Sequence, residues 1–280
     1  MTTVRIIGAP TDYGANRRGV DMGPSAIRYA GLAEELERTG VDAVDDGDVL
    51  APHAEERDPD AETLPSGRAK FLRETREVVT SLADRVEGSL ADGEVPLVLG
   101  GDHSVAIGSV TGSARDAEIG VVWFDAHGDC NTPETSPSGN VHGMPLAAVL
   151  GIGEFADVEW ANARGLRPEN VAIVGLRDVD ERGISNVVDD ALDVATTRTD
   201  GLHVSLDLDW LDPREAPGVG TPVRGGVTYR EAHSALEAVA DRDCLRSLEL
   251  VEINPILDER NETASLAVEL AASALGKQIL

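Results

Sequence analysis

The residues with the most evident chemistry lie in VWFDAHGDCN, residues 122–131, where an apolar run ends in Asp125, His127 and Asp129. Side chains alternate faces along an extended chain, so residues at every second position point the same way. Two carboxylates on one face repel each other, and burying them is costly unless a positive charge lies among them. Taken alone, the segment would also fit a solvated loop with helix-capping aspartates. We expect a cation beside these three side chains.

Three further apolar runs end in polar residues of the same kind. One leads into GGDHS with His103, the second ends in Asp207 and Asp209, and the third carries Glu252. A structural zinc site would favour thiolate and imidazole ligands over so many carboxylates. Mixed carboxylate and imidazole ligands suit Mn²⁺, Fe²⁺ or a hydrolytic centre with two metal ions about 3.5 Å apart. The candidate ligands are His103, Asp125, His127, Asp129, Asp207 and Asp209.

The elements that must position these residues alternate along the chain as strands and helices. The predicted strands are 4–7, 41–44, 96–99, 119–124, 171–176, 202–208 and 248–253, and the predicted helices are 23–38, 67–90, 229–240 and 263–275. Such alternation predicts one α/β domain, residues 1–280, with a central parallel sheet and helices on both faces. Ligands bind at the carboxyl ends of the strands in open α/β sheets, which is where the polar residues collect.

The charge balance excludes some partners and suggests a setting. The chain has 51 acidic and 24 basic residues, for a net charge of -27. Such a surface disfavours nucleic acid and anionic membranes. The acidic residues would repel one another strongly in dilute buffer, whereas molar salt screens charges within about 3 Å. The charge balance therefore predicts a halophilic host. The N-terminal residues form no signal peptide pattern and no apolar run could span a membrane, so we expect a cytoplasmic protein.

Four motifs carry a resemblance to a known family. They are GGDHS (100–104), DAHGDCN (125–131), SLDLDWLDP (205–213) and EINPILDERNETASLAVEL (252–270), preceded by RRGVDMGPSAIRYAGL (17–32). With them the chain resembles the arginases, ureohydrolases of the bacterial type. The resemblance implies the three-layer α/β/α sandwich of the arginase/deacetylase fold. It also implies hydrolysis of L-arginine to L-ornithine and urea, by attack of a hydroxide bridging two Mn²⁺ ions on the guanidinium carbon. A homo-oligomer, trimer or hexamer, would be usual for the family.

The resemblance assigns metal ligands by motif. One Mn²⁺ ion of each subunit would be held by His103, Asp125, Asp129 and Asp207. The second would be held by His127, Asp125, Asp207 and Asp209, so that Asp125 and Asp207 bridge the ions.

The resemblance also assigns substrate contacts. The catalytic residues would be Asp129, His142 and Glu252, with Glu252 gripping the guanidinium and His142 passing a proton to the departing amine. The α-carboxylate of arginine would meet Asn131, Ser136 and Ser138, with Asn140 beside them, because hydroxyl and amide groups donate to carboxylates. Asp180, in GLRDVD (175–180), would bind the α-ammonium group.

The chain departs from the family pattern after Asp180. Between GLRDVD and SLDLD the family usually has a helix, an edge strand and a second helix, but here residues 181–204 leave room for about one helix. We expect that the edge strand is missing, that residues 171–176 form the new edge, and that the metal ligands survive while substrate binding is weakened. Two alternatives stay open: a ureohydrolase for agmatine or a guanidino acid, and an inactive relative that binds metal.

Overall fold

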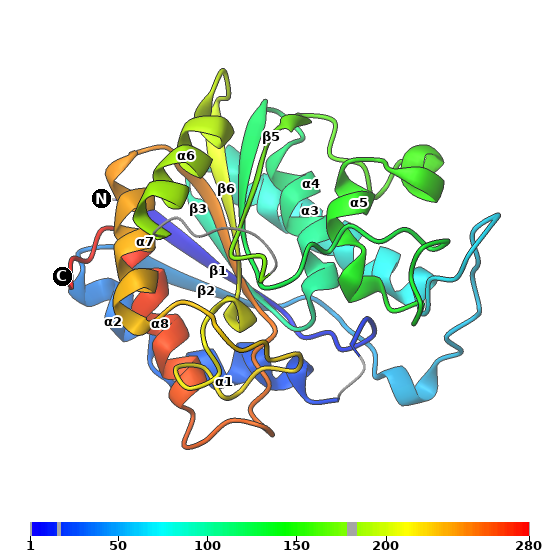
Figure 1. The fold of residues 1–280 in the computed structure, drawn as a ribbon, viewed down its shortest axis with the longest axis horizontal. Coiled ribbons are helices and arrows are strands. Elements are labelled where there is room, and N and C mark those ends of the chain that lie inside the picture. The colour runs from blue at the N-terminus through cyan, green and yellow to red at the C-terminus, as the bar shows by residue number, and fades with distance from the viewer. Residues whose placement is uncertain (1, 16–17, 178–183, 280) are drawn as a thin grey trace.

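The computed structural model describes residues 2–15, 18–177 and 184–279, and its centre is a parallel sheet of seven strands (Figure 1). The strand order is β2-β1-β3-β7-β6-β4-β5, and every neighbouring pair is parallel. The strands are β1 (Thr3–Ala9), β2 (Asp42–Asp48), β3 (Val95–Gly100), β4 (Ile119–Phe124), β5 (Leu166–Val174), β6 (Gly201–Asp207) and β7 (Leu245–Val251). Each of the seven predicted strands is present.

Helices cover both faces of the sheet, which gives three layers (Figure 1). Helices α1, α2, α6, α7 and α8 lie on one face, and α3, α4 and α5 lie on the other. The predicted α/β/α sandwich is therefore confirmed. The helices are α1 (Gly23–Tyr29), α2 (Leu32–Arg38), α3 (Leu72–Ala91), α4 (Ala106–Ser113), α5 (Pro145–Val149), α6 (Ile184–Thr196), α7 (Tyr229–Asp241) and α8 (Glu262–Ala274). Among the described residues, no helix is both long and apolar enough to cross a membrane.

Strand β4 shows how the sequence builds these layers. All six of its residues are buried. Val122 and Phe124 pack in the core beneath α6, α7 and α8, whereas Val121 and Trp123 pack in the core beneath α4 and α5. A strand buried on both faces is a continuous apolar run, and each such side chain contributes about 1.5–3 kcal/mol. The metal motif therefore begins on a rigid strand.

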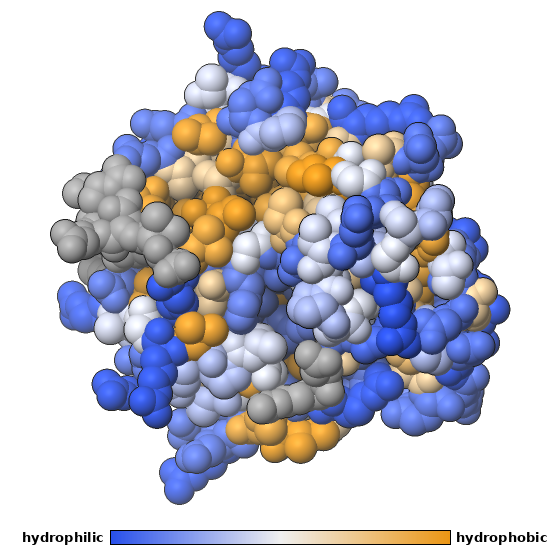
Figure 2. All heavy atoms as spheres, turned by 45° about the vertical axis from the view of Figure 1, so that its right-hand side comes forward, coloured by the Kyte–Doolittle hydropathy of each residue, from blue (hydrophilic) through white to orange (hydrophobic). Residues whose placement is uncertain are grey.

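The sheet ends at β5, which pairs only with β4 among the described strands. Residues 184–200 contain α6 and no strand, so the predicted edge is confirmed; residues 178–183 lie outside the described part of the chain. The register shifts between Leu166 and Val171, and the exposed residues Arg167, Pro168 and Glu169 lie in this irregular stretch. Charges, proline and bulges all discourage further strand pairing. Figure 2 shows a patch of hydrophobic side chains in the upper part of its view, on the side where β5 closes the sheet.

Two helix predictions were inaccurate. The helix predicted at 23–38 is split into α1 and α2 at Gly31, whose φ of 91° is left-handed and breaks the helix. The helix predicted at 67–90 begins only at Leu72. Helix α4 was not predicted, because all its residues are buried and its sequence AIGSVTGS has no amphipathic period.

Candidate metal centre

The four strands that carry the polar motifs are consecutive in the sheet, in the order β3-β7-β6-β4. Their carboxyl ends bring together His103 after β3, Glu252 after β7, Asp207 on β6 and Asp125 after β4. The turn after β3 depends on Gly101, because a Cβ atom there would lie 1.9 Å from the carbonyl oxygen of Thr11. The prediction of one site at this edge of the sheet thus matches the observed arrangement.

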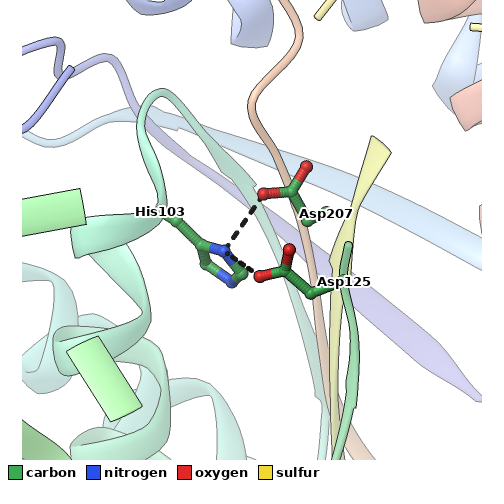
Figure 3. A group of neighbouring side chains, drawn as sticks. All are labelled: His103, Asp125 and Asp207. Carbon is green, nitrogen blue, oxygen red and sulfur yellow. Dashed lines mark ion pairs between the residues drawn. The ribbon is translucent and has the colours of Figure 1, made fainter. Parts of the chain in front are cut away.

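His103 lies at the centre of the first group of candidate ligands. Its Nδ1 atom is 3.2 Å from Asp125 Oδ2, 3.0 Å from Asp129 Oδ2 and 3.2 Å from Asp207 Oδ2. Figure 3 shows the ring of His103 pointing at the carboxylates of Asp125 and Asp207. Among the described residues, Nδ1 nevertheless has no hydrogen-bond partner. Ligands on neighbouring octahedral positions lie about 3 Å apart when each metal–ligand bond is about 2.1 Å, so these spacings suit a shared cation.

His127 lies at the centre of the second group. Its Nδ1 atom is 3.0 Å from Asp209 Oδ2 and 3.5 Å from Asp125 Oδ1. Asp125 therefore turns Oδ2 toward His103 and Oδ1 toward His127, as a carboxylate that bridges two cations would. Both groups have the composition of a metal site: His103, Asp125 and Asp207 in one, and Asp125, His127 and Asp209 in the other.

The electrostatics of the site also call for cations. In the described part of the chain, the only ion-pair partners of Asp125, Asp129, Asp207 and Asp209 are His103 and His127. Burial, together with neighbouring carboxylates, raises the pKa of Asp207 and Asp209 above its usual range and that of Asp129 to about 7. Hydrogen bonds to Asp125 and Asp209 raise the pKa of His127 to about 11. Without metal ions, bound protons thus offset the repulsion between these carboxylates. Bound metal ions would take over this role.

Three residues that support these groups were missed by the sequence analysis. Trp123 donates from Nε1 to Asp125 Oδ2 at 2.9 Å and stacks on the ring of His103. Ser205 Oγ lies 2.8 Å from His103 Nε2, and Thr221 donates to Asp209 Oδ2 at 2.9 Å. Trp123 and Ser205 share a face with Asp125 and Asp207 by strand alternation, which could have identified them. No sequence pattern points to Thr221.

Glu252 and His142 form a second pair beside the candidate ligands. Glu252 Oε1 lies 3.1 Å from His142 Nδ1 and accepts a hydrogen bond from the backbone N–H of His103 at 3.0 Å. Burial opposes both charges, but the contact lowers the pKa of Glu252 and raises the pKa of His142 to about 9. Glu252 has a left-handed φ of 64° and Asp129 one of 43°. Such strain in non-glycine residues is held by surrounding structure and is common at functional sites.

A cleft of about 420 Å³ opens over the two groups and is large enough for a small molecule. His127, Asp129, His142, Asp207, Asp209 and Glu252 line it, and so do the predicted substrate residues Asn131, Ser136, Ser138 and Asn140. Asn140 is buried, and its side-chain oxygen accepts a hydrogen bond from Lys70. Asp180, the predicted ammonium contact, lies outside the described residues.

Comparison with known proteins places the chain in a family. A model of the Arginase family matches residues 2–276. The arginase of Bacillus caldovelox is 46% identical over 303 residues, which span all of both proteins, and that of Bacillus subtilis strain 168 is 46% identical over 301 residues, 99% of each. The solved structure of the Bacillus caldovelox arginase superposes with a TM-score of 0.90 at 45% identity over all of both chains. The alignment spans 303 positions and the chain has 280 residues, so the alignment contains gaps in this chain. The chain therefore belongs to the arginase family.

Proposed function

We propose that this protein is a manganese-dependent arginase that hydrolyses L-arginine to L-ornithine and urea. The observation that carries the proposal is Asp125, whose two oxygens face two histidine-centred groups beneath a cleft lined by Glu252. Two adjacent cation sites would supply a nucleophile from water, and a buried carboxylate beside them would pair with a guanidinium cation. Membership of the arginase family supports the same substrate.

We assign two Mn²⁺ ions to each subunit. His103, Asp125, Asp129 and Asp207 would hold one, and His127, Asp125, Asp207 and Asp209 the other. When bound, the ions would lower the pKa of a water molecule and so supply a nucleophile near neutral pH. Carboxylate and imidazole ligands without thiolates suit Mn²⁺ better than metals that prefer sulfur ligands.

The residues of the chain itself would hold and protonate the substrate. Glu252 is ionised and buried, so it can pair with the guanidinium cation and fix its carbon over the metal centre. His142, with a pKa of about 9, is protonated at neutral pH and can donate a proton to the departing amine. The contact between Glu252 and His142 keeps the donor beside the reacting group.

The residues that line the cleft between positions 131 and 138 would bind the amino-acid end of arginine. Ser136 and Ser138 offer hydroxyl groups and Asn131 an amide, all of which can donate to an α-carboxylate. Agmatine lacks that carboxylate and would leave these donors unpaired, which lowers its affinity. The role of Asp180 stays a prediction from sequence resemblance, as do a homo-oligomer of three or six subunits, a cytoplasmic location and a halophilic host.

The test is urea release from L-arginine and from agmatine, measured in parallel in molar salt after loading with Mn²⁺. We expect turnover of arginine and little or none of agmatine. Equal or preferential turnover of agmatine would favour the other ureohydrolase activity. Bound manganese without urea from either compound would favour the inactive relative.

A further inference from the structure

A buried polar column lies behind the metal centre, on the face of the sheet that packs against α4. His203 and Ser205 of β6 are paired in register with Ser247 and Glu249 of β7. All four side chains are at most 1% exposed. Polar groups are rarely buried this deeply without hydrogen-bond partners or a function, so their arrangement calls for an explanation.

Ser205 connects this column to a candidate metal ligand. If His103 binds a cation through Nδ1, its Nε2 atom must carry the proton and donate it to Ser205 Oγ, 2.8 Å away. The hydroxyl of Ser205 then still has its own proton to donate. Glu249 is the residue opposite Ser205 in the β6–β7 ladder, on the same face, and its Oε1 atom has no hydrogen-bond partner in the described part of the chain.

Glu249 carries its charge in an unusual setting. Its Oε2 atom accepts a hydrogen bond from Ser109 at 2.5 Å, and the Nε2 atom of His203 lies 3.6 Å from Oε1. Among the described residues no lysine or arginine pairs with it. Burial would raise the pKa of Glu249, but His203, His103 and Ser109 together hold it below the usual value. A carboxylate charge therefore lies behind His103 without a full counter-charge.

We propose that Glu249 is a positioning residue for the metal ion on the His103 side, acting through Ser205 and its own negative charge. The carboxylate would fix the tautomer and ring orientation of His103 and help to offset the charge of the cation. Carboxylates behind metal-binding histidines have this effect elsewhere, and removing one costs about 10–100-fold in metal affinity. This inference rests on the proposed manganese centre.

The test is a calorimetric titration of metal-free full-length protein with Mn²⁺, followed in parallel by electron paramagnetic resonance. The variant Glu249→Gln keeps the shape of the side chain and removes its charge. We expect the affinity for one of the two ions to fall about 10–100-fold and the other to change little, because His103 belongs to one ligand group only. At one to two equivalents of Mn²⁺, the spectrum should then shift from a spin-coupled pair toward isolated ions.

The matched control is Ser113→Ala. Ser247 donates to Ser113 at 2.9 Å, so the control changes the far end of the same network, away from His103. It should lower the thermal midpoint without changing either affinity. If Glu249→Gln does not fold, the variant Ser109→Ala takes its place, because it removes only a hydrogen bond to the carboxylate. It should lower the affinity for the same ion to a smaller extent. Unchanged affinities in a folded variant would overturn the inference, whereas a wild-type protein that binds no Mn²⁺ would overturn the proposed function itself.

Discussion

The carboxyl ends of the central strands and the β5 edge of the sheet differ in how tightly their surroundings constrain them. Asp125, Asp207 and Asp209 are at most 3% exposed, and each contacts a histidine and at least one further donor. Among the described strands, β5 has one neighbour, and it has an irregular register and several partly exposed side chains. The centre is fixed by many contacts at once, whereas the edge strand is held on one side only among the described strands.

The two regions are nevertheless in contact, because β5 lies directly beside β4, the strand that leads into Asp125. The backbone N–H of Asp125 donates to the carbonyl oxygen of Val174 on β5 at 3.1 Å. Arg177, just beyond β5, donates from Nη2 to the carbonyl oxygens of Asp209 and Trp210 at 2.7 Å each. The edge strand therefore supports the metal centre, and changes at graded distances from the centre should have graded effects.

The largest effect should follow from Asp125→Ala at the centre. This change removes the carboxylate that faces both histidines, so both ions should bind weakly and urea release should fall by more than about 10³-fold. The measurement is manganese content by atomic absorption together with urea release. Retention of both ions at near-normal affinity would show that Asp125 is not the bridging ligand.

Glu252→Gln should have the next largest effect. It removes the charge that would pair with the guanidinium but keeps the shape of the side chain, so kcat/KM for arginine should fall about 10²–10³-fold, the loss of a buried charged contact of about 3–4 kcal/mol. Manganese content should stay at the wild-type value, which separates this variant from Asp125→Ala. A normal kcat/KM in this variant would show that Glu252 does not pair with the guanidinium group.

The pair formed by His142 and Glu252 predicts a pH dependence for the metal-free protein. The pKa of His142 is raised from 6.5 to about 9, so the stability it contributes is fully present below pH 6.5 and is lost as pH rises through about 9. The contribution is at most about 3 kcal/mol. The difference in unfolding free energy between wild type and His142→Asn should therefore shrink between pH 6.5 and 9. A difference that is constant over this range would contradict the pairing.

Arg177→Met tests the link between the edge and the centre. The variant keeps much of the apolar stem but leaves several carbonyl groups unpaired. The free energy of unfolding should therefore fall by about 2 kcal/mol. Denaturant unfolding gives this value, and the affinity for Mn²⁺ should fall only modestly. A loss of manganese as large as that of Asp125→Ala would show that the edge holds the ligands more directly than its contacts suggest.

The smallest effect on catalysis should come from Pro168→Val on the β5 edge. Activity should be unchanged, but the variant introduces a backbone N–H group and a β-branched residue at an exposed edge, which favours strand pairing between molecules. Light scattering over time should show more self-association than in wild type. An equal rate of self-association would mean that other features protect this edge.

The sequence predicts the central half of the molecule better than its periphery for physical reasons. The strand at 119–124 is buried on both faces, so its apolar run specifies it without ambiguity, and its observed bounds are the same. The six candidate ligands could be recognised because polar residues at strand ends have few structural explanations. Thr221 reaches Asp209 from a loop, and Glu249 contacts Ser109 across layers. Such contacts between distant segments leave no local periodicity that a sequence could display.

The most direct test of the central claim is anomalous diffraction at the manganese absorption edge from crystals soaked in Mn²⁺. The arrangement predicts two peaks about 3.5 Å apart at the carboxyl ends of β3, β4 and β6, one beside His103 and one beside His127, with Asp125 between them. A single peak, or two peaks without Asp125 as a shared ligand, would contradict it.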